Sequence, residues 1–108
     1  MSDVEAVREA VREVEDPELE LSLVGLGLVY DIRLEQREIP DEGQHCEIDL
    51  TLTSPGCPVA PEIMAAVHLA ALSVEGVESV HINLVWNPHW DARIHADEET
   101  RFEMGIFD

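Results

Sequence analysis

The residues with the clearest capacity for chemistry lie in the segment 51–58, which reads TLTSPGCP and contains Cys57. Apolar and polar residues alternate before it, as in a half-buried strand, and apolar residues recur every three to four positions after it, as in a helix. Pro58 and Pro61 suit a first helical turn, where a missing N–H matters little. Cys57 is therefore predicted at a helix N-terminus, where the dipole and unpaired N–H groups favour a thiolate that attacks electrophiles or binds metal.

Two carboxylates form a second candidate group, because Asp16 and Glu18 flank Pro17. The local pattern favours a helix end with two solvated carboxylates, since the residue before a proline avoids helical angles. The alternative is that one carboxylate lies beside Cys57 as a proton acceptor or hydrogen-bond partner. A carboxylate there would raise the pKa of the thiol and oppose the helix terminus, and the sequence leaves that balance open.

A third candidate group is the aromatic segment 86–90, which reads WNPHW and follows an expected strand. If this strand is parallel to the strand before Cys57, the two carboxyl ends lie at one edge of the sheet, so 53–57 and 86–90 become neighbours. One tryptophan is expected in the core and the other exposed, where tryptophans often anchor partners. Trp86, His89 and Trp90 are therefore candidate partner-binding residues.

The order of the helices and strands that must position these residues predicts an α/β fold. This fold is expected to be a small two-layer sandwich that forms one domain, residues 1–108. The expected order is helix, strand, strand, helix, strand and short helix, with the three strands in a mixed sheet and the helices on one face. In the first strand, Leu28, Tyr30, Ile32 and Leu34 are expected to face inward. The expected ranges are helix 3–14, strand 28–35, turn 40–43, strand 46–53, helix 59–74, strand 80–86 and helix 97–104.

The charge is extreme, with six basic residues, all arginine, against 24 acidic ones and a net charge of −18. Such a field repels phosphate, so nucleic acids and anionic membranes are poor partners. The carboxylates are dispersed along the chain, which favours adaptation to a salt-rich, halophilic cytoplasm over an acidic face that recruits a basic partner. No apolar run approaches the ~20 residues of a membrane span, and no leader is evident, so a cytoplasmic location is expected.

The remaining cysteine, glycines and histidines have simpler interpretations. Cys46 is expected to be a small core residue, and two cysteines do not make a disulfide framework. Gly25 and Gly27 are expected to allow tight packing, since no phosphate-binding motif is complete. The five histidines lack zinc-site spacing, so a closed metal site within one chain is not expected. A site shared by two copies through Cys57, and hence a homodimer, stays open.

Taken together, these motifs resemble the iron–sulfur assembly domain shared by SufT and PaaD proteins and by cytosolic iron–sulfur targeting factors. The match spans nearly the whole chain and keeps the order of the motifs. The matching segments are 16–18 (DPE), 26–32 (LGLVYDI), 51–58 (TLTSPGCP), 76–77 (GV) and 84–90 (LVWNPHW), with an ending like that of 101–105 (RFEMG). The family's PaaD branch carries an added cysteine-rich segment, and this chain stops at Asp108 without a CxxC pair, which favours the SufT-like branch.

The resemblance implies a non-enzymatic maturation factor that helps deliver iron–sulfur clusters to client proteins, with those clients and the assembly machinery as partners. It maps the family's cysteine to Cys57, its pocket threonine to Thr53 and its acidic pair to Asp16 and Glu18. No cofactor is expected to be tightly bound, and Cys57 is expected to ligate iron or a cluster transiently. Three alternatives stay open: a thiol-dependent enzyme, an accessory subunit of a phenylacetate-type ring oxygenase, and an interaction module that docks through a tryptophan.

Overall fold

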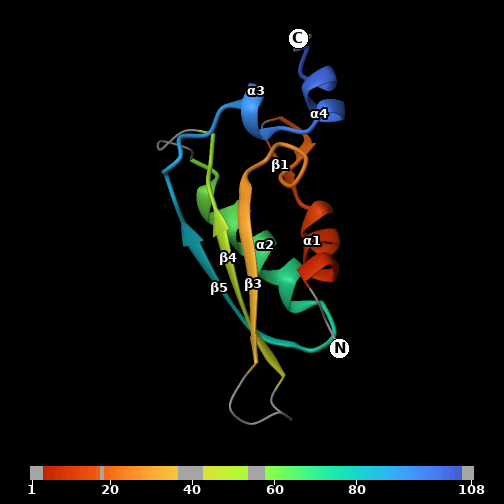
Figure 1. Ribbon diagram of the computed structural model, residues 1–108, viewed down its shortest axis with the longest axis vertical. Coiled ribbons are helices and arrows are strands. Elements are labelled where there is room, and N and C mark those ends of the chain that lie inside the picture. Colours follow the sequence, from red (N-terminus) through yellow and green to blue (C-terminus); the bar gives the residue numbers. More distant parts are fainter. Residues whose placement is uncertain (1–3, 18, 37–42, 54–57, 106–108) are drawn as a thin grey trace.

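The computed structural model describes residues 4–17, 19–36, 43–53 and 58–105, and Figure 1 shows how their helices and strands are arranged. Glu18 and Cys57 lie outside these ranges. The elements are α1 (Val4–Arg12), β1 (Glu15–Asp16), β2 (Leu21–Ser22), β3 (Val29–Gln36), β4 (Gln44–Leu50), α2 (Ala60–Leu72), β5 (Val77–Leu84), α3 (Ala92–His95) and α4 (Glu98–Glu103). No helix in the described part is long and apolar enough to cross a membrane.

The main sheet has the order β3-β4-β5, with β3 antiparallel to β4 and β4 parallel to β5. Helix α1 packs on α2 and β3, and α2 packs on β5, so the two helices form one layer against the sheet (Figure 1). The predicted mixed three-stranded sheet and its helical layer are therefore confirmed.

The core lies between that sheet and the two helices. In β4, Cys46, Ile48 and Leu50 have no exposed surface, whereas the alternating residues His45, Glu47 and Asp49 stay partly exposed. This alternation buries one face of the strand and leaves the other open. The buried face meets apolar residues of α1 and α2, namely Val7, Val11, Ile63, Val67 and Ala71.

Strand β3 departs from the predicted alternation at its start. Val29 pairs with Leu50 but Asp31 pairs with Asp49, so Tyr30 is an extra residue in a β-bulge. Val29 is consequently buried, at 8% exposure, and Tyr30 is only partly buried. The prediction that Tyr30 faces inward and Val29 outward is wrong, because one inserted residue exchanges the two faces.

The N-terminal third of the chain also differs from expectation. Helix α1 ends at Arg12, before the expected end at Val14, and β1 pairs with β2 in a small antiparallel hairpin. This hairpin, residues 15–22, was not expected, because two-residue strands carry too little alternation to be detected. Helix α3 was also not predicted. The expected helix 97–104 is present as α4, and the Asp97 side chain accepts a hydrogen bond from the Thr100 amide at its start.

The chain after β5 folds back onto the segment 25–27, and we call residues 90–105 the cap. A Cβ atom on Gly27, whose φ is +77°, would lie 2.0 Å from the His95 carbonyl oxygen. The Trp90 indole donates to the Leu26 carbonyl at 2.8 Å, and the Asp97 amide donates to the Gly25 carbonyl at 2.8 Å. The predicted role of these glycines in tight packing is confirmed, and the cap is the partner that needs it.

Candidate functional site

The candidate site begins at the sheet edge where β4 and β5 end. Leu50 pairs with Leu84, and the Val85 amide donates to the Leu50 carbonyl at 2.9 Å. The chains leading to Thr53 and Trp86 therefore leave the sheet from the same edge, as the parallel pairing predicted. Cys57 follows Thr53 in the segment 54–57, which lies outside the described residues.

The two tryptophans at this edge have different environments. Trp90 is partly buried against the core, and its indole holds the cap to Leu26. Trp86 is 39% exposed, and His89 is also exposed. The prediction of one core and one exposed tryptophan is confirmed. Trp86 and His89 are thus the two candidates at this edge with surface available to a partner.

Thr51, immediately after β4, was not singled out from the sequence. It is 1% exposed, and its amide donates to the Leu28 carbonyl at 2.8 Å. Within the described part of the chain, its hydroxyl is the one buried side-chain polar atom without a hydrogen-bond partner. A buried hydroxyl without a partner costs about 1–3 kcal/mol, so this position at the root of the candidate site is energetically unusual.

Asp16 is buried, with 2% exposure. Its carboxylate accepts a hydrogen bond from the Leu19 amide at 3.2 Å, and its carbonyl accepts one from the Glu20 amide at 2.7 Å. The expectation of two solvated carboxylates is wrong for Asp16, because this residue is buried at the turn end of the hairpin rather than ending a helix in water. Glu18 lies outside the described residues.

Cys46 has a buried thiol that is not expected to react. Burial raises the pKa of its thiol to about 11, with a smaller contribution from Glu47, so it is protonated at neutral pH. Its assignment to the core is confirmed. Within the described ranges, no three histidine, cysteine or carboxylate side chains gather closely enough to hold a metal ion.

Residues 4–83 match the family model described as iron–sulfur cluster assembly protein. The chain belongs to the iron–sulfur cluster assembly protein family. The Bacillus subtilis Fe-S protein maturation auxiliary factor YitW is 41% identical over 102 residues, which cover 94% of this chain and 93% of that protein. The Staphylococcus aureus Fe-S protein maturation auxiliary factor SufT is 40% identical over 75 residues, covering 69% of this chain and 78% of that protein.

A solved structure shares the fold of this chain. A domain of unknown function from Bacillus anthracis superposes with a TM-score of 0.81 and 31% identity, covering 94% of this chain and 90% of that one. The family match itself ends at residue 83, before Trp86 and the cap, so these parts lie beyond the matched stretch.

Within the stretch matched to the iron–sulfur assembly family, the open face of the sheet carries a network that we call the sheet ladder: Arg33, His45, Glu47, Asp49, Ser79 and Asn83. The two Arg33 guanidinium nitrogens donate to the two Asp49 carboxylate oxygens at 2.9 and 3.0 Å. The Asn83 amide donates to both Glu47 and Asp49, at 3.0 and 3.1 Å. His45 contacts Ser79 through one ring nitrogen and Glu47 through the other.

These contacts account for the protonation of the sheet ladder. Hydrogen bonds from Asn83, and then from His45, lower the pKa of Glu47. The hydrogen bonds from Arg33 lower the pKa of Asp49, and Asp49, followed by Asp31, raises the pKa of Arg33. The sequence signal for the ladder is the alternation of charged residues along three strands, but the pairing depends on register.

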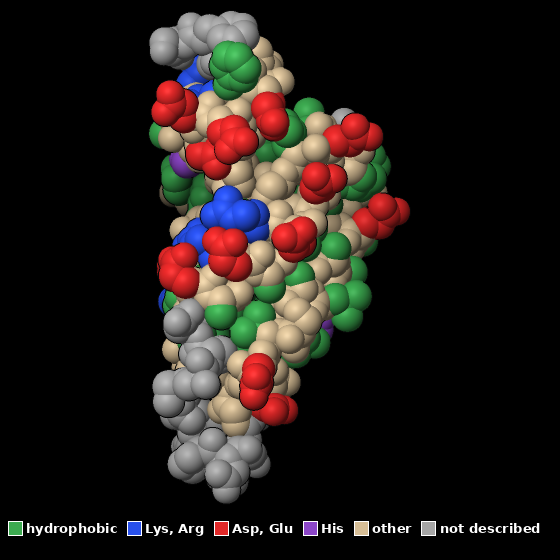
Figure 2. Space-filling model, turned by 90° about the vertical axis from the view of Figure 1, so that its right-hand side faces the viewer, with side chains coloured by type: hydrophobic (Ala, Val, Ile, Leu, Met, Phe, Trp, Pro, Cys, Tyr) green, Lys and Arg blue, Asp and Glu red, His purple; other side chains and the backbone are tan. Residues whose placement is uncertain are grey.

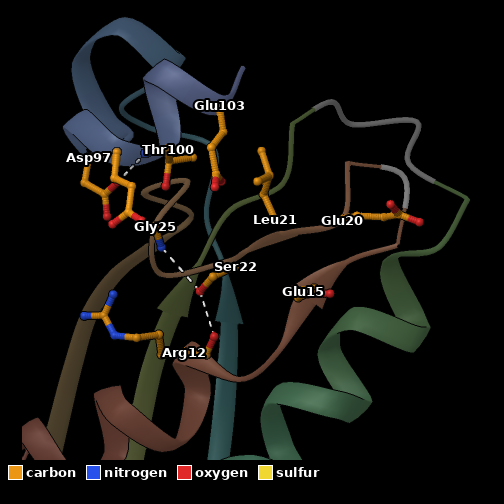
Figure 3. Close-up of a pocket in the computed structure, with 10 residues that line it drawn as sticks. Arg12, Glu15, Glu20, Leu21, Ser22, Gly25, Asp97, Thr100 and Glu103 are labelled. Carbon is orange, nitrogen blue, oxygen red and sulfur yellow. Dashed lines mark hydrogen bonds between the residues drawn. The ribbon is translucent and has the colours of Figure 1, made fainter. Parts of the chain in front are cut away.

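A second charged region lies between the hairpin and the cap. It is a groove of about 320 Å³, which we call the acidic groove (Figure 3). Five of its lining residues are carboxylates. The lining consists of Arg12, Glu15, Glu20, Leu21, Ser22, Gly25, Asp97, Glu99, Thr100 and Glu103. The sequence could not show this grouping, because about 75 residues separate its two halves, as the numbering of Ser22 and Asp97 shows.

Proposed function

We propose that this protein is a maturation factor that assists delivery of iron–sulfur clusters to client proteins, with Cys57 as a transient ligand or thiol. The observation that carries the proposal is the 41% identity to an Fe-S protein maturation auxiliary factor across 94% of the chain. The family match over residues 4–83 supports it independently. The names of these relatives favour this role over a thiol-dependent enzyme or a subunit of a ring oxygenase.

The number of thiols supports transient rather than resident binding of the cluster, which is cargo here. An iron–sulfur cluster takes four protein ligands, usually cysteine thiolates. Cys46 is buried in the core, so Cys57 is the remaining cysteine of the chain. One thiolate per chain can share a cluster with an assembly protein or a client, and shared ligation allows release. A second copy could contribute another Cys57, which keeps a homodimer in the proposal.

Four further residues complete the proposed site, and Thr53, Trp86 and Asp16 are the described ones among them. Thr53 follows β4 and is partly buried, and Trp86 follows the neighbouring strand β5 and is exposed. Asp16 and Glu18 complete the site as its acidic pair. The burial of Asp16 supports a specific role, since a carboxylate taken from water needs compensating partners. Trp86 and His89 would contact the client or the assembly protein.

We expect the factor to act in the cytoplasm and without catalytic turnover of its own. The test is complementation of a deletion strain, read as the activity of iron–sulfur enzymes in extracts. Cys57→Ser should fail to restore that activity, whereas Cys46→Ala, which removes the other thiol from the core, should restore it if the variant folds. Full restoration by Cys57→Ser would refute the thiol role.

A spectroscopic experiment separates cluster handling from other thiol chemistry. After anaerobic reconstitution with iron and sulfide, the wild type should show visible charge-transfer bands that Cys57→Ser lacks. A reactive thiol without these bands would instead support the thiol enzyme as the correct alternative.

A further inference from the structure

The acidic groove has an uncompensated charge, unlike other carboxylate-rich parts of the molecule. Among the ion pairs of the described residues, none joins Glu20, Glu99 or Glu103 to an arginine. The one arginine in the lining, Arg12, pairs with Glu9 at 3.4 Å. Converging carboxylates repel each other, so this arrangement lowers stability unless a cation joins them.

The hydroxyl of a largely buried threonine in the groove points to the same kind of ligand. Thr100 is 7% exposed and lies between Asp97 and Glu103 at the cap side of the groove (Figure 3). Its amide is bonded to Asp97, but its hydroxyl has no hydrogen-bond partner among the described residues. A ligand with several N–H donors would satisfy this oxygen together with the carboxylates.

An exposed aromatic side chain lies next to the groove. Phe102 is 68% exposed and lines a second, more open hollow of about 550 Å³ that shares Asp97 and Glu99 with the groove. Figure 2 shows acidic side chains gathered around this end of the molecule, beside exposed apolar side chains. Exposed apolar surface with a charged rim is typical of a protein-binding site.

We propose that the acidic groove and Phe102 dock an arginine-bearing segment of a partner protein, with an apolar side chain of that segment against Phe102. The guanidinium fits the groove because it presents five N–H donors and stays charged at every physiological pH. A carboxylate pair can accept bidentate hydrogen bonds from it, and the Thr100 hydroxyl can accept another. The proposal goes beyond cluster delivery and does not depend on Cys57.

The docking segment would contact other elements than those that lead to Thr53 and Trp86. The groove is formed by the hairpin and α4, whereas Thr53 and Trp86 follow the ends of β4 and β5. A partner bound at the groove would lie beside the hairpin that carries Asp16, the described member of the proposed acidic pair.

The probe is a short fluorescent peptide in which two arginines flank one leucine, and binding is read as anisotropy at physiological ionic strength. Glu99→Gln/Glu103→Gln should weaken binding about tenfold, because two charge-assisted hydrogen bonds to the peptide arginines lose their charged acceptors. The matched control is Glu62→Gln/Glu75→Gln, which removes the same charge elsewhere and, like Glu99, includes a carboxylate in a first helical turn. Asp97 is left intact because it caps α4.

The apolar contact of the proposal is tested by a variant of Phe102 and a control variant of equal exposure. Phe102→Ala should weaken the peptide about fivefold, which is typical of a modest anchor, whereas Leu69→Ala should not change it. Leu69 is 67% exposed on α2, almost the same as Phe102. Replacing the two peptide arginines with glutamate should abolish binding.

Three results would overturn the proposal. They are an unmeasurable affinity of the wild type for the peptide, equal losses in the groove variant and its charge-matched control, and equal effects of Phe102→Ala and Leu69→Ala. Equal losses would mean that the peptide responds to the overall negative field rather than to the groove. None of these results bears on Cys57, so failure here is distinguishable from failure of the maturation role.

Discussion

The sheet ladder and the acidic groove are both rich in carboxylates, but they differ in whether neighbouring side chains donate hydrogen bonds to those carboxylates. In the ladder, Glu47 and Asp49 each receive donors from neighbouring strands, and both pKa values are lowered. In the groove, Glu99 and Glu103 line the same hollow, and no ion pair among the described residues joins either of them to an arginine. The carboxylates of this protein therefore fall into two groups. Those of the ladder are held by hydrogen bonds within the fold, and those of the groove can bind a partner.

The difference follows from how each region is built. The ladder lies on three strands whose register places donors opposite acceptors, so its pairs form whenever the sheet forms. The groove exists only where the cap meets the hairpin, and the one arginine in its described lining, Arg12, pairs with Glu9 instead. We therefore expect changes to the ladder to alter stability, and changes to the groove to alter binding and salt response.

The largest expected effect on stability comes from disrupting the contact between the cap and Gly27. Gly27→Ala places a Cβ at 2.0 Å from the His95 carbonyl oxygen on a residue with φ of +77°. Both the overlap and the left-handed backbone are unfavourable, so we expect a loss of about 2–4 kcal/mol in the free energy of unfolding. Denaturant unfolding measures it, and peptide binding at the groove should fall with it.

Gly105→Ala is the control for backbone conformation alone. Gly105 has φ of +83°, but nothing lies within 4 Å of its added Cβ. We expect a loss of only about 1 kcal/mol. If both variants lose the same free energy of unfolding, the cap is not packed against Gly27 in solution.

The next effect concerns the ladder. Asp49→Asn removes the charge and one of the two acceptor oxygens of the bidentate Arg33 pair. This pair is partly exposed and screened, so we expect the melting temperature to fall by only about 3–5 °C. The stabilisation belongs to the ionised carboxylate, because its folded pKa is lowered. It should be present above the unfolded pKa of about 4 and disappear as the pH falls through the folded pKa.

Melting temperatures measured from neutral pH down to pH ~3 test both statements about Asp49. The wild type and Asp49→Asn should differ at neutral pH and converge in acid. Glu99→Gln, in the groove, should not lower the melting temperature at neutral pH. A loss equal to that of Asp49→Asn would mean that the groove carboxylates are also structural.

A smaller effect is expected in the response to salt. At a net charge of −18, molar potassium chloride should raise the melting temperature above its low-salt value, because it screens repulsion over distances beyond about 3 Å. Glu99→Gln/Glu103→Gln should reduce this rise by a few degrees, and Asp49→Asn should not reduce it. An unchanged wild-type melting temperature between low and molar salt would contradict adaptation to a salt-rich cytoplasm.

The sequence predicted the parts of this molecule that depend on periodic patterns. The alternation around Ile48 located β4 and its buried face, and the glycine pair 25 and 27 indicated tight packing before its partner was known. The β-bulge at Tyr30 was missed because one inserted residue reverses the faces without changing composition. The ladder could be predicted only as alternating charges, because its pairs depend on strand register.

The candidate site shows the same division. The common edge of Thr53 and Trp86 followed from parallel pairing, which is a rule of topology. The burial of Asp16 did not follow, because the hairpin that turns it inward consists of two-residue strands. The acidic groove was unpredictable for a different reason, since its two halves come together only through the tertiary packing of the cap.

The last expected effect is a gain in stability, at the residue that follows β4. Thr51 continues the row of His45, Glu47 and Asp49 along β4, but its buried hydroxyl has no partner among the described residues. Thr51→Val has nearly the same shape and removes the hydroxyl, so we expect about 1 kcal/mol of added stability, whereas Thr51→Ser, which keeps the hydroxyl, should not gain. Denaturant unfolding measures both. A loss of stability in Thr51→Val would show that water or another group satisfies the hydroxyl in solution.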